Sequence, residues 1–241
     1  IRGNPDPSPE LWRALGHALL DGDGPADRLV AWMDQEGFRQ TRPLFERARN
    51  QGIGSVADAP APLREFFATV DSLPDWADAT LLRQGARACQ VSGMAGLYAL
   101  REALMAGYQA SAINKTLILT GALARGAPRR IAETTKWWVD VTAEGGMDRY
   151  SEGFKSTLQV RLIHALVRRQ LPGKPEWKHA EWGLPVNQSD MLATNLGFSV
   201  LFLIGQRILG VPLPQGEAEA VMHLWRVIGW VMGVEPHWRP K

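Results

Sequence analysis

The stretch STLQVRLIHALVRR, residues 156 to 169, decides the fold class of this chain. Residues three and four positions apart share one face of a helix. On this spacing the polar residues form a single stripe, made of Thr157, Arg161, His164 and Arg168. Most of the remaining circumference is aliphatic, which is typical of a buried helix. The pattern predicts a core helix that carries polar groups into apolar surroundings.

His164 is the residue of this helix that most needs an explanation. A buried imidazole flanked by guanidinium groups is disfavoured as a cation, and the neutral form is the one that binds metal ions. Arg161 and Arg168 lie one turn to either side and suit the carboxylates of a planar cofactor such as haem, because guanidinium groups bind carboxylates bidentately. The alternative is a core histidine bonded to a backbone carbonyl, with both arginines paired to acidic neighbours. The spacing leaves both interpretations open.

A second polar stripe precedes this helix in RRIAETTKWW, residues 129 to 138. Here a base, an acid, a hydroxyl and an aromatic ring share one predicted helix face, at Arg130, Glu133, Thr134 and Trp137. The simpler interpretation is an exposed amphipathic helix with an Arg130–Glu133 ion pair, which contributes under about 1 kcal/mol. The stripe alone does not separate a site from a solvated face.

The rest of the chain favours an all-α fold. Helix-forming residues dominate, alternating β-branched runs are scarce, and glycine and proline gather between the helical segments. The length suits one globular multi-helix domain over residues 1–241. Helices are predicted near 9–20, 24–36, 41–50, 61–70, 76–89, 92–106, 110–124, 128–142, 152–170, 188–209 and 215–233.

Two apolar segments carry further expectations. Residues 188–209 predict a buried core helix capped by Asn187 or Ser189, because polar residues interrupt the run and argue against a membrane span. Residues 91–126 contain a small residue every few positions, which suits either tight helix packing or the wall of an apolar pocket.

Composition excludes several classes of function. The formal net charge is +2 and the basic residues are dispersed, which argues against a nucleic-acid partner. Cys89 is the single cysteine, so an intramolecular disulfide and a cysteine-rich metal site are excluded. No signal peptide is visible, but the chain begins with Ile1, so the sequence leaves the compartment undetermined.

Four motifs stand in order along the chain: R-x-x-x-T at 130–134, VRLIHALVR at 160–168, WGLPVNQSDMLAT at 182–194 and HLWRVIGWVMGV at 223–234. Together they resemble the latex clearing protein and rubber oxygenase family, which includes the endoplasmic-reticulum-bound oxygenase of mycophenolic acid biosynthesis. The resemblance runs from about Pro74 to Val234. Family members of known activity are all-helical haem b proteins that use dioxygen to cleave isoprenoid double bonds.

The resemblance implies roles for individual residues. His164 corresponds to the axial haem ligand, and Arg130 and Thr134 to paired polar residues beside a buried haem pocket. The family has a lysine before that threonine, whereas this chain has Glu133. The expected catalytic residues are therefore Arg130 and Thr134, with Glu133 as a hypothetical acid or base. The expected haem-binding residues are His164, Arg161, Arg168 and Arg130.

The resulting expectation is a haem b-dependent oxygenase that activates dioxygen to oxidise or cleave the double bonds of an apolar, isoprenoid-like substrate. An axial ligand and a polar distal side are the means by which a protein directs haem toward oxygen activation. The alternatives are a non-catalytic helical protein that binds haem or an apolar ligand, and a peroxidase-like enzyme acting on a small secondary metabolite. The sequence does not identify an electron donor.

Overall fold

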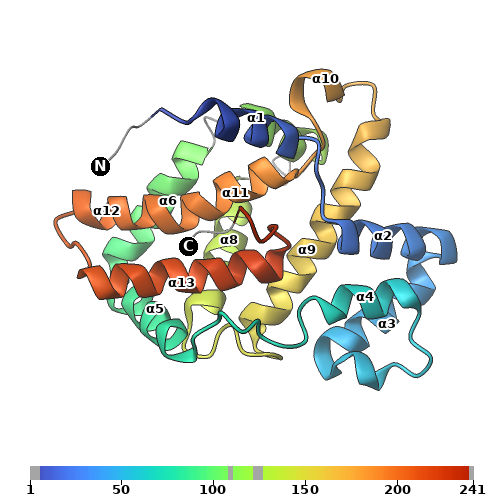
Figure 1. Ribbon diagram of the computed structural model, residues 1–241, viewed down its shortest axis with the longest axis horizontal. Helices are drawn as coiled ribbons and strands as arrows, with labels where there is room; N and C mark the ends of the chain where they lie inside the picture. The colour runs from blue at the N-terminus through green and yellow to red at the C-terminus, as the bar shows by residue number, and fades with distance from the viewer. Residues whose placement is uncertain (1–5, 108–110, 122–126, 239–241) are drawn as a thin grey trace.

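The structure is a computed structural model that describes residues 6–107, 111–121 and 127–238. Within these ranges it is helical and contains no strand, which confirms the all-α prediction (Figure 1). That the chain is one domain remains an expectation. The α-helices are α1 (Pro9–Ala18), α2 (Gly24–Glu36), α3 (Phe38–Gln51), α4 (Ala61–Ala68), α5 (Ala79–Val91), α6 (Gly93–Gly107), α7 (Ser111–Leu119), α8 (Ala127–Thr142), α9 (Glu152–Gln170), α10 (His179–Trp182), α11 (Gln188–Leu196), α12 (Phe202–Ile208) and α13 (Gln215–Met232).

Side-chain caps fix where the key helices begin. The Asp23 carboxylate accepts the Ala26 N–H at the start of α2, and the Ser151 hydroxyl accepts the Phe154 N–H at the start of α9. Of the two caps expected for the helix after 187, the structure has Asn187, whose Oδ1 lies 2.9 Å from the Asp190 nitrogen.

Helix α9 lies at the centre of the arrangement. It packs against α2, α8 and α13, and α13 in turn packs along α5. In Figure 1, α2, α3 and α4 lie on one side of α9, and α5, α6, α12 and α13 lie on the other. The core therefore lies against the helix that carries His164, and the Ile163 side chain on the same helix stays exposed.

The predicted helix at 188–209 differs from the expectation in two ways. It is divided into α11, a π-helical turn over Gly197–Leu201, and α12. Its apolar window is only 33% buried, so the prediction of a buried core helix is wrong for most of its length. The physical reason is that α12 packs on α6 through one face and leaves Ile204 and Ile208 exposed. By length and composition alone, the continuous helical run Gln188–Ile208, which these three elements form together, is long and apolar enough to cross a membrane.

The small residues of the segment 91–126 serve close packing where the structure describes them. A Cβ added at Gly205 of α12 would lie 2.7 Å from the Cβ of Ala99 on α6. A Cβ added at Gly96 would likewise lie 3.4 Å from the Phe202 ring. These contacts match the tight-packing interpretation. Residues 108–110 and 122–126, which also belong to that segment, lie outside the described residues.

Candidate functional site

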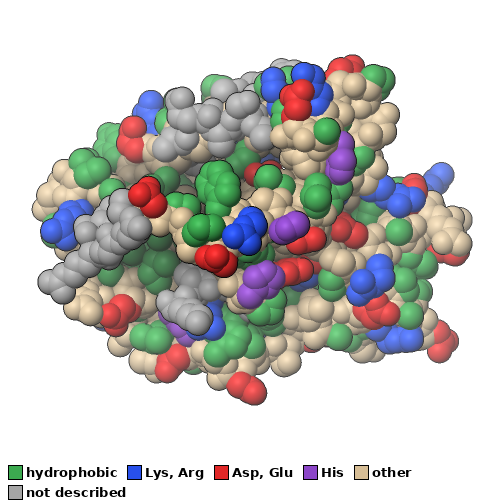
Figure 2. Space-filling model, turned by 45° about the horizontal axis from the view of Figure 1, so that its top comes forward, with side chains coloured by type: hydrophobic (Ala, Val, Ile, Leu, Met, Phe, Trp, Pro, Cys, Tyr) green, Lys and Arg blue, Asp and Glu red, His purple; other side chains and the backbone are tan. Residues whose placement is uncertain are grey.

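Surface charge does not single out a site on the face drawn in Figure 2, where acidic and basic side chains are interspersed and hydrophobic side chains lie among them. The candidate site is therefore built from the buried polar residues of α9 and their neighbours. Thr157, Arg161 and Arg168 are buried, and His164 is half-buried. Their burial agrees with the polar stripe predicted for this helix.

The His164 imidazole is held neutral by its surroundings. Its Nδ1 atom is buried and has no hydrogen-bond partner among the described residues. Burial, together with the positive charges of Arg168 and Arg130, lowers the pKa of His164 from 6.5 to about 3 against the opposing effect of Asp23. At neutral pH the ring therefore carries no charge, which is the state that a metal ligand requires.

Arg161 is fully engaged in a buried ion pair. Its Nε and Nη2 donate to the two carboxylate oxygens of Asp23 at 2.6 and 2.9 Å. Its Nη1 donates to the Thr69 hydroxyl at 3.3 Å and to the Val231 carbonyl at 3.2 Å. Because every guanidinium nitrogen has a partner, Arg161 is not available to a cofactor carboxylate. The sequence-based assignment of Arg161 to haem binding therefore gains no support from these contacts, and the structure has the alternative, a pairing with an acidic neighbour.

Arg168 is only partly engaged. Its Nε donates to Asp27 at 2.7 Å and its Nη1 to the Val186 carbonyl at 2.9 Å. The remaining nitrogen, Nη2, is buried and has no partner in the described part of the chain. Arg168 thus pairs with an acid, as the simpler interpretation expected, and still has a buried donor one turn from His164.

Helix α8 brings some of the second stripe toward α9. Arg130 is half-buried and close enough for its charge to lower the pKa of His164. Thr134, one turn further, is also half-buried. The Trp137 indole N–H donates to the Thr157 hydroxyl on α9 at 3.0 Å. Three members of the predicted stripe therefore lie on the half-buried side of α8.

Glu133 is placed differently from the other members of its stripe. It forms an ion pair with Arg129 at 2.9 Å, and 54% of its side chain is exposed. A solvent-exposed carboxylate paired to a neighbouring base is in a poor position to act over a buried imidazole. The hypothesis that Glu133 serves as the acid or base gains no support from this placement, and Glu133 is left out of the site.

An aromatic cluster borders the contact between α8 and α9. The Trp137 ring lies 5.3 Å from Phe198 and 5.9 Å from Trp225, measured between ring centroids. Phe198 and Trp225 stack at 5.2 Å with an interplanar angle of 6°. These rings give the Thr157 end of the site an apolar wall.

The acidic partners of the site were missed from the sequence. Asp23 is the cap that precedes α2, and Asp27 lies in the first turn of that helix. At both positions the sequence pattern indicates only the start of a helix. The Trp137–Thr157 contact could have been predicted from the sequence, because each residue lies on one of the two polar stripes and such stripes can face each other.

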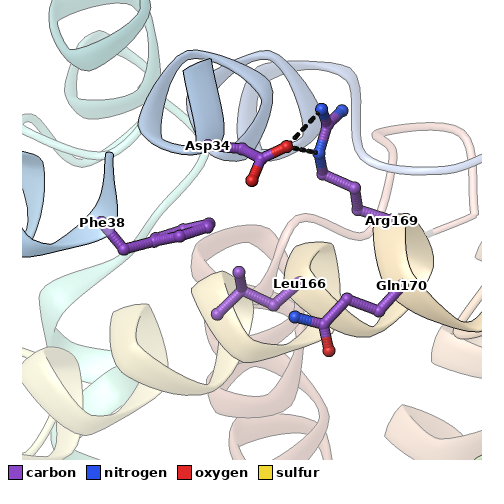
Figure 3. A pocket seen from close by; sticks show the side chains of 5 residues that line it. All are labelled: Asp34, Phe38, Leu166, Arg169 and Gln170. Carbon is purple, nitrogen blue, oxygen red and sulfur yellow. Dashed lines mark hydrogen bonds and ion pairs between the residues drawn. The ribbon is translucent and has the colours of Figure 1, made fainter. Parts of the chain in front are cut away.

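A surface pocket of about 380 Å³ lies on another side of α9, and it is lined by Asp34, Phe38, Leu166, Arg169 and Gln170. Figure 3 shows the Asp34–Arg169 ion pair on one side of this pocket and the Phe38 and Leu166 side chains facing its interior. Neither His164 nor any residue of α8 belongs to this lining. The pocket is therefore separate from the candidate site.

Comparisons with known proteins agree with the fold and the motifs. Residues 89–241 match the family model described as ER-bound oxygenase mpaB/B'/Rubber oxygenase, catalytic domain. The chain is 29% identical over 221 residues to the rubber oxygenase of Streptomyces sp. (strain K30), covering 88% of this chain and 53% of that protein. It therefore spans about half the length of that curated relative. These matches confirm the resemblance found in the motifs.

A solved structure of latex clearing protein LCP in the closed state has the same fold. It matches with a TM-score of 0.72 at 24% sequence identity, over 93% of this chain and 61% of that chain.

Proposed function

The chain belongs to the family of ER-bound oxygenase mpaB/B' and rubber oxygenase, and we propose that it is a haem b-dependent oxygenase acting on an apolar, unsaturated, isoprenoid-like substrate. The observation that carries the proposal is a neutral imidazole with a buried nitrogen that has no partner among the described residues, on the helix at the centre of the fold. His164 would be the axial ligand of the haem iron. The relatives are oxygenases by name, which supports the reaction class.

Whether the residues fit such a cofactor can be judged from two buried nitrogens that have no partner among the described residues. His164 Nδ1 and Arg168 Nη2 are both buried, one turn apart on α9, and neither has a hydrogen-bond partner within the described ranges. A buried polar atom left without a partner costs about 1–3 kcal/mol, so a ligand that bound both nitrogens would remove that cost. A metal ion at the imidazole and a propionate at the guanidinium nitrogen would satisfy both. The residues fit haem through His164 and Arg168, whereas Arg161 is occupied by Asp23.

Each chain residue then has a definable task. Burial and the charges of Arg168 and Arg130 keep the His164 imidazole unprotonated and ready to bind a metal. Arg130 and Thr134 on α8 supply a donor and a hydroxyl that orient a bound polar molecule. Trp137 joins α8 to α9 through Thr157 and excludes water from that end. Haem b, when bound, would supply the iron that activates dioxygen for oxidation of a carbon–carbon double bond.

The apolar substrate class is proposed from the family and is consistent with the apolar surroundings of α8 and α9. The aromatic rings of Trp137, Phe198 and Trp225 offer apolar contact and carry no charge. Such surroundings favour a hydrocarbon chain over a charged metabolite. Dioxygen and a small apolar polyene are the proposed co-substrates.

The visible absorption spectrum of protein purified with haem supplied tests the cofactor. We expect a Soret band in the parent that is lost or shifted in His164→Ala and retained in His17→Ala, a matched control because His17 is exposed on α1. A folded parent that stays colourless would sink the proposal.

Catalysis needs a second measurement. The reduced protein is exposed to air with squalene, oxygen uptake is recorded, and carbonyl products are trapped as hydrazones. Uptake coupled to product would support an oxygenase. A haem-loaded protein that only autoxidises would instead be a haem-binding protein without turnover, and the oxygenase proposal would fail.

A further inference from the structure

A second pocket, of about 420 Å³, opens between α5, α12 and α13. Its apolar lining comes from all three helices, at Leu81, Leu203 and Met222. Its polar lining comes from α13, chiefly Glu219, His223 and Arg226. The volume is within the range of small-molecule sites, about 300–1,000 Å³. None of the residues proposed to bind haem belongs to this lining.

Arg226 is the cation of this pocket. Its guanidinium carbon lies 4.3 Å from the centre of the Trp76 ring, so the group is stacked in place on an aromatic face. Its Nε atom is buried and has no hydrogen-bond acceptor among the described residues. Within the same part of the chain, no carboxylate forms an ion pair with it. A buried guanidinium donor of this kind lacks the acceptor that such groups normally have.

His223 supplies a second donor beside it. The Asp78 backbone N–H donates to His223 Nε2 at 2.9 Å, so Nε2 is the unprotonated nitrogen of a neutral ring and Nδ1 carries the hydrogen. The carboxylate of Asp78 itself is used as the cap of α5, where it accepts the N–H groups of Thr80 and Leu81. Both bonds go to Oδ1, and no ion pair joins this carboxylate to Arg226 among the described residues.

Glu219 and Arg226 give the pocket opposite charges at different positions along α13. It accepts a hydrogen bond from Gln215 at 2.8 Å and stands seven residues before Arg226, which on a helix is about 10 Å along the axis. A negative head group is attracted to the Arg226 end and repelled from the Glu219 end. The apolar side chains of Leu81, Leu203 and Met222 then remain for the rest of the ligand.

We propose that this pocket binds a small apolar carboxylic acid, with its carboxylate on Arg226 and His223 and its hydrocarbon tail on Leu81, Leu203 and Met222. The site is independent of the proposed haem function, because it shares no residue with it. The guanidinium of Arg226, which lines the pocket, matches a carboxylate bidentately, and the stacking on Trp76 holds the group in place.

Isothermal titration of the full chain, supplied with haem, tests the site with octanoate as the acid and 1-octanol as the uncharged probe. We expect saturable octanoate binding, at least tenfold weaker in Arg226→Gln and unchanged in Arg207→Gln, since Arg207 is an exposed arginine on α12 outside the lining. Octanol should bind at least tenfold more weakly than octanoate. Binding that persists in His164→Ala separates this pocket from the proposed haem site.

Several results would overturn the proposal: no saturable octanoate binding, equal affinity for octanol, or unchanged affinity in Arg226→Gln. If Arg226→Gln fails to fold, Glu219→Gln decides the question. Removing the opposing negative charge should tighten octanoate binding severalfold and leave octanol binding unchanged. Unchanged or weaker octanoate binding in Glu219→Gln would count against the site.

Discussion

At the scale of single residues, Arg161 and Asp23 form the ion pair that is most shielded from water in the described part of the chain. The two side chains are 4% and 2% exposed, so neither charge has access to water. Replacing Arg161 by Met keeps the aliphatic stem and leaves the Asp23 carboxylate buried without its partner. Removing one member of a buried pair costs about 3–5 kcal/mol. We expect Arg161→Met to lower the free energy of unfolding by that amount, measured by urea denaturation.

The same helix offers a matched control for this prediction. Arg169 pairs with Asp34 at 2.6 Å, but both side chains are nearly half exposed. Exposed pairs contribute under about 1 kcal/mol, so Arg169→Met should change the unfolding free energy by no more than that. Equal losses in the two variants would contradict the distinction between the pairs.

The residue scale also shows what a sequence can and cannot predict about the site. The neutral state of His164 could be predicted from the sequence, because an apolar helix buries the ring and Arg168 lies one turn away on the same face, and both lower its pKa. The partner of Arg161 does not follow, since Asp23 is 138 positions away in the sequence and only tertiary packing brings the two together. For the same reason, the sequence placed Glu133 on a helix stripe but did not predict that its side chain would be exposed and paired with Arg129.

At the scale of elements, the contact between α5 and α13 depends on a glycine. A Cβ added at Gly85 would lie 2.3 Å from the Ala220 carbonyl oxygen, a distance that only movement of a helix backbone can relieve. We expect Gly85→Ala to lower the free energy of unfolding by about 1–3 kcal/mol, although alanine is the better helix former by up to about 1 kcal/mol. Thermal and urea unfolding measure the loss.

Gly16 on α1 is the control for this change, because a Cβ there meets no atom of the described residues within 4 Å. Gly16→Ala should leave stability unchanged or raise it by up to about 1 kcal/mol. A stabilised Gly85→Ala would mean that α5 and α13 separate more easily than their close approach indicates.

Helix boundaries were predictable where caps and breakers mark them. The expected 24–36 and 152–170 helices begin after Asp23 and Ser151 as found, because side-chain caps are local signals. The π-helical turn at Gly197–Leu201 was not predictable, since the hydrophobic pattern continues through it. Burial of that run was not predictable either, because it depends on which face α6 covers.

At the scale of the whole molecule, the all-α class followed from composition and periodicity, while the arrangement around α9 depends on contacts between segments distant in the sequence. Helix α9 packs against α2, α8 and α13, which bury Thr157, Arg161 and Arg168. Burial of the His164 ring on this helix lowers its pKa, so protonation of His164 is linked to the free energy of unfolding.

This linkage gives a pH dependence with a definite sign. The pKa of His164 is 6.5 when unfolded and about 3 when folded, so between these values the unfolded chain binds more protons. The contribution of the neutral His164 ring to the free energy of unfolding is complete above pH 6.5 and falls as the pH is lowered toward 3.

We expect the parent to lose unfolding free energy between about pH 7 and pH 4 more steeply than His164→Leu, which has no titrating ring. His17→Gln, altered at an exposed position, should keep the parental slope. Parallel curves for the parent and His164→Leu, measured by urea unfolding across that range, would mean that the folded protein accommodates a protonated imidazole and that His164 is not held in the metal-binding state.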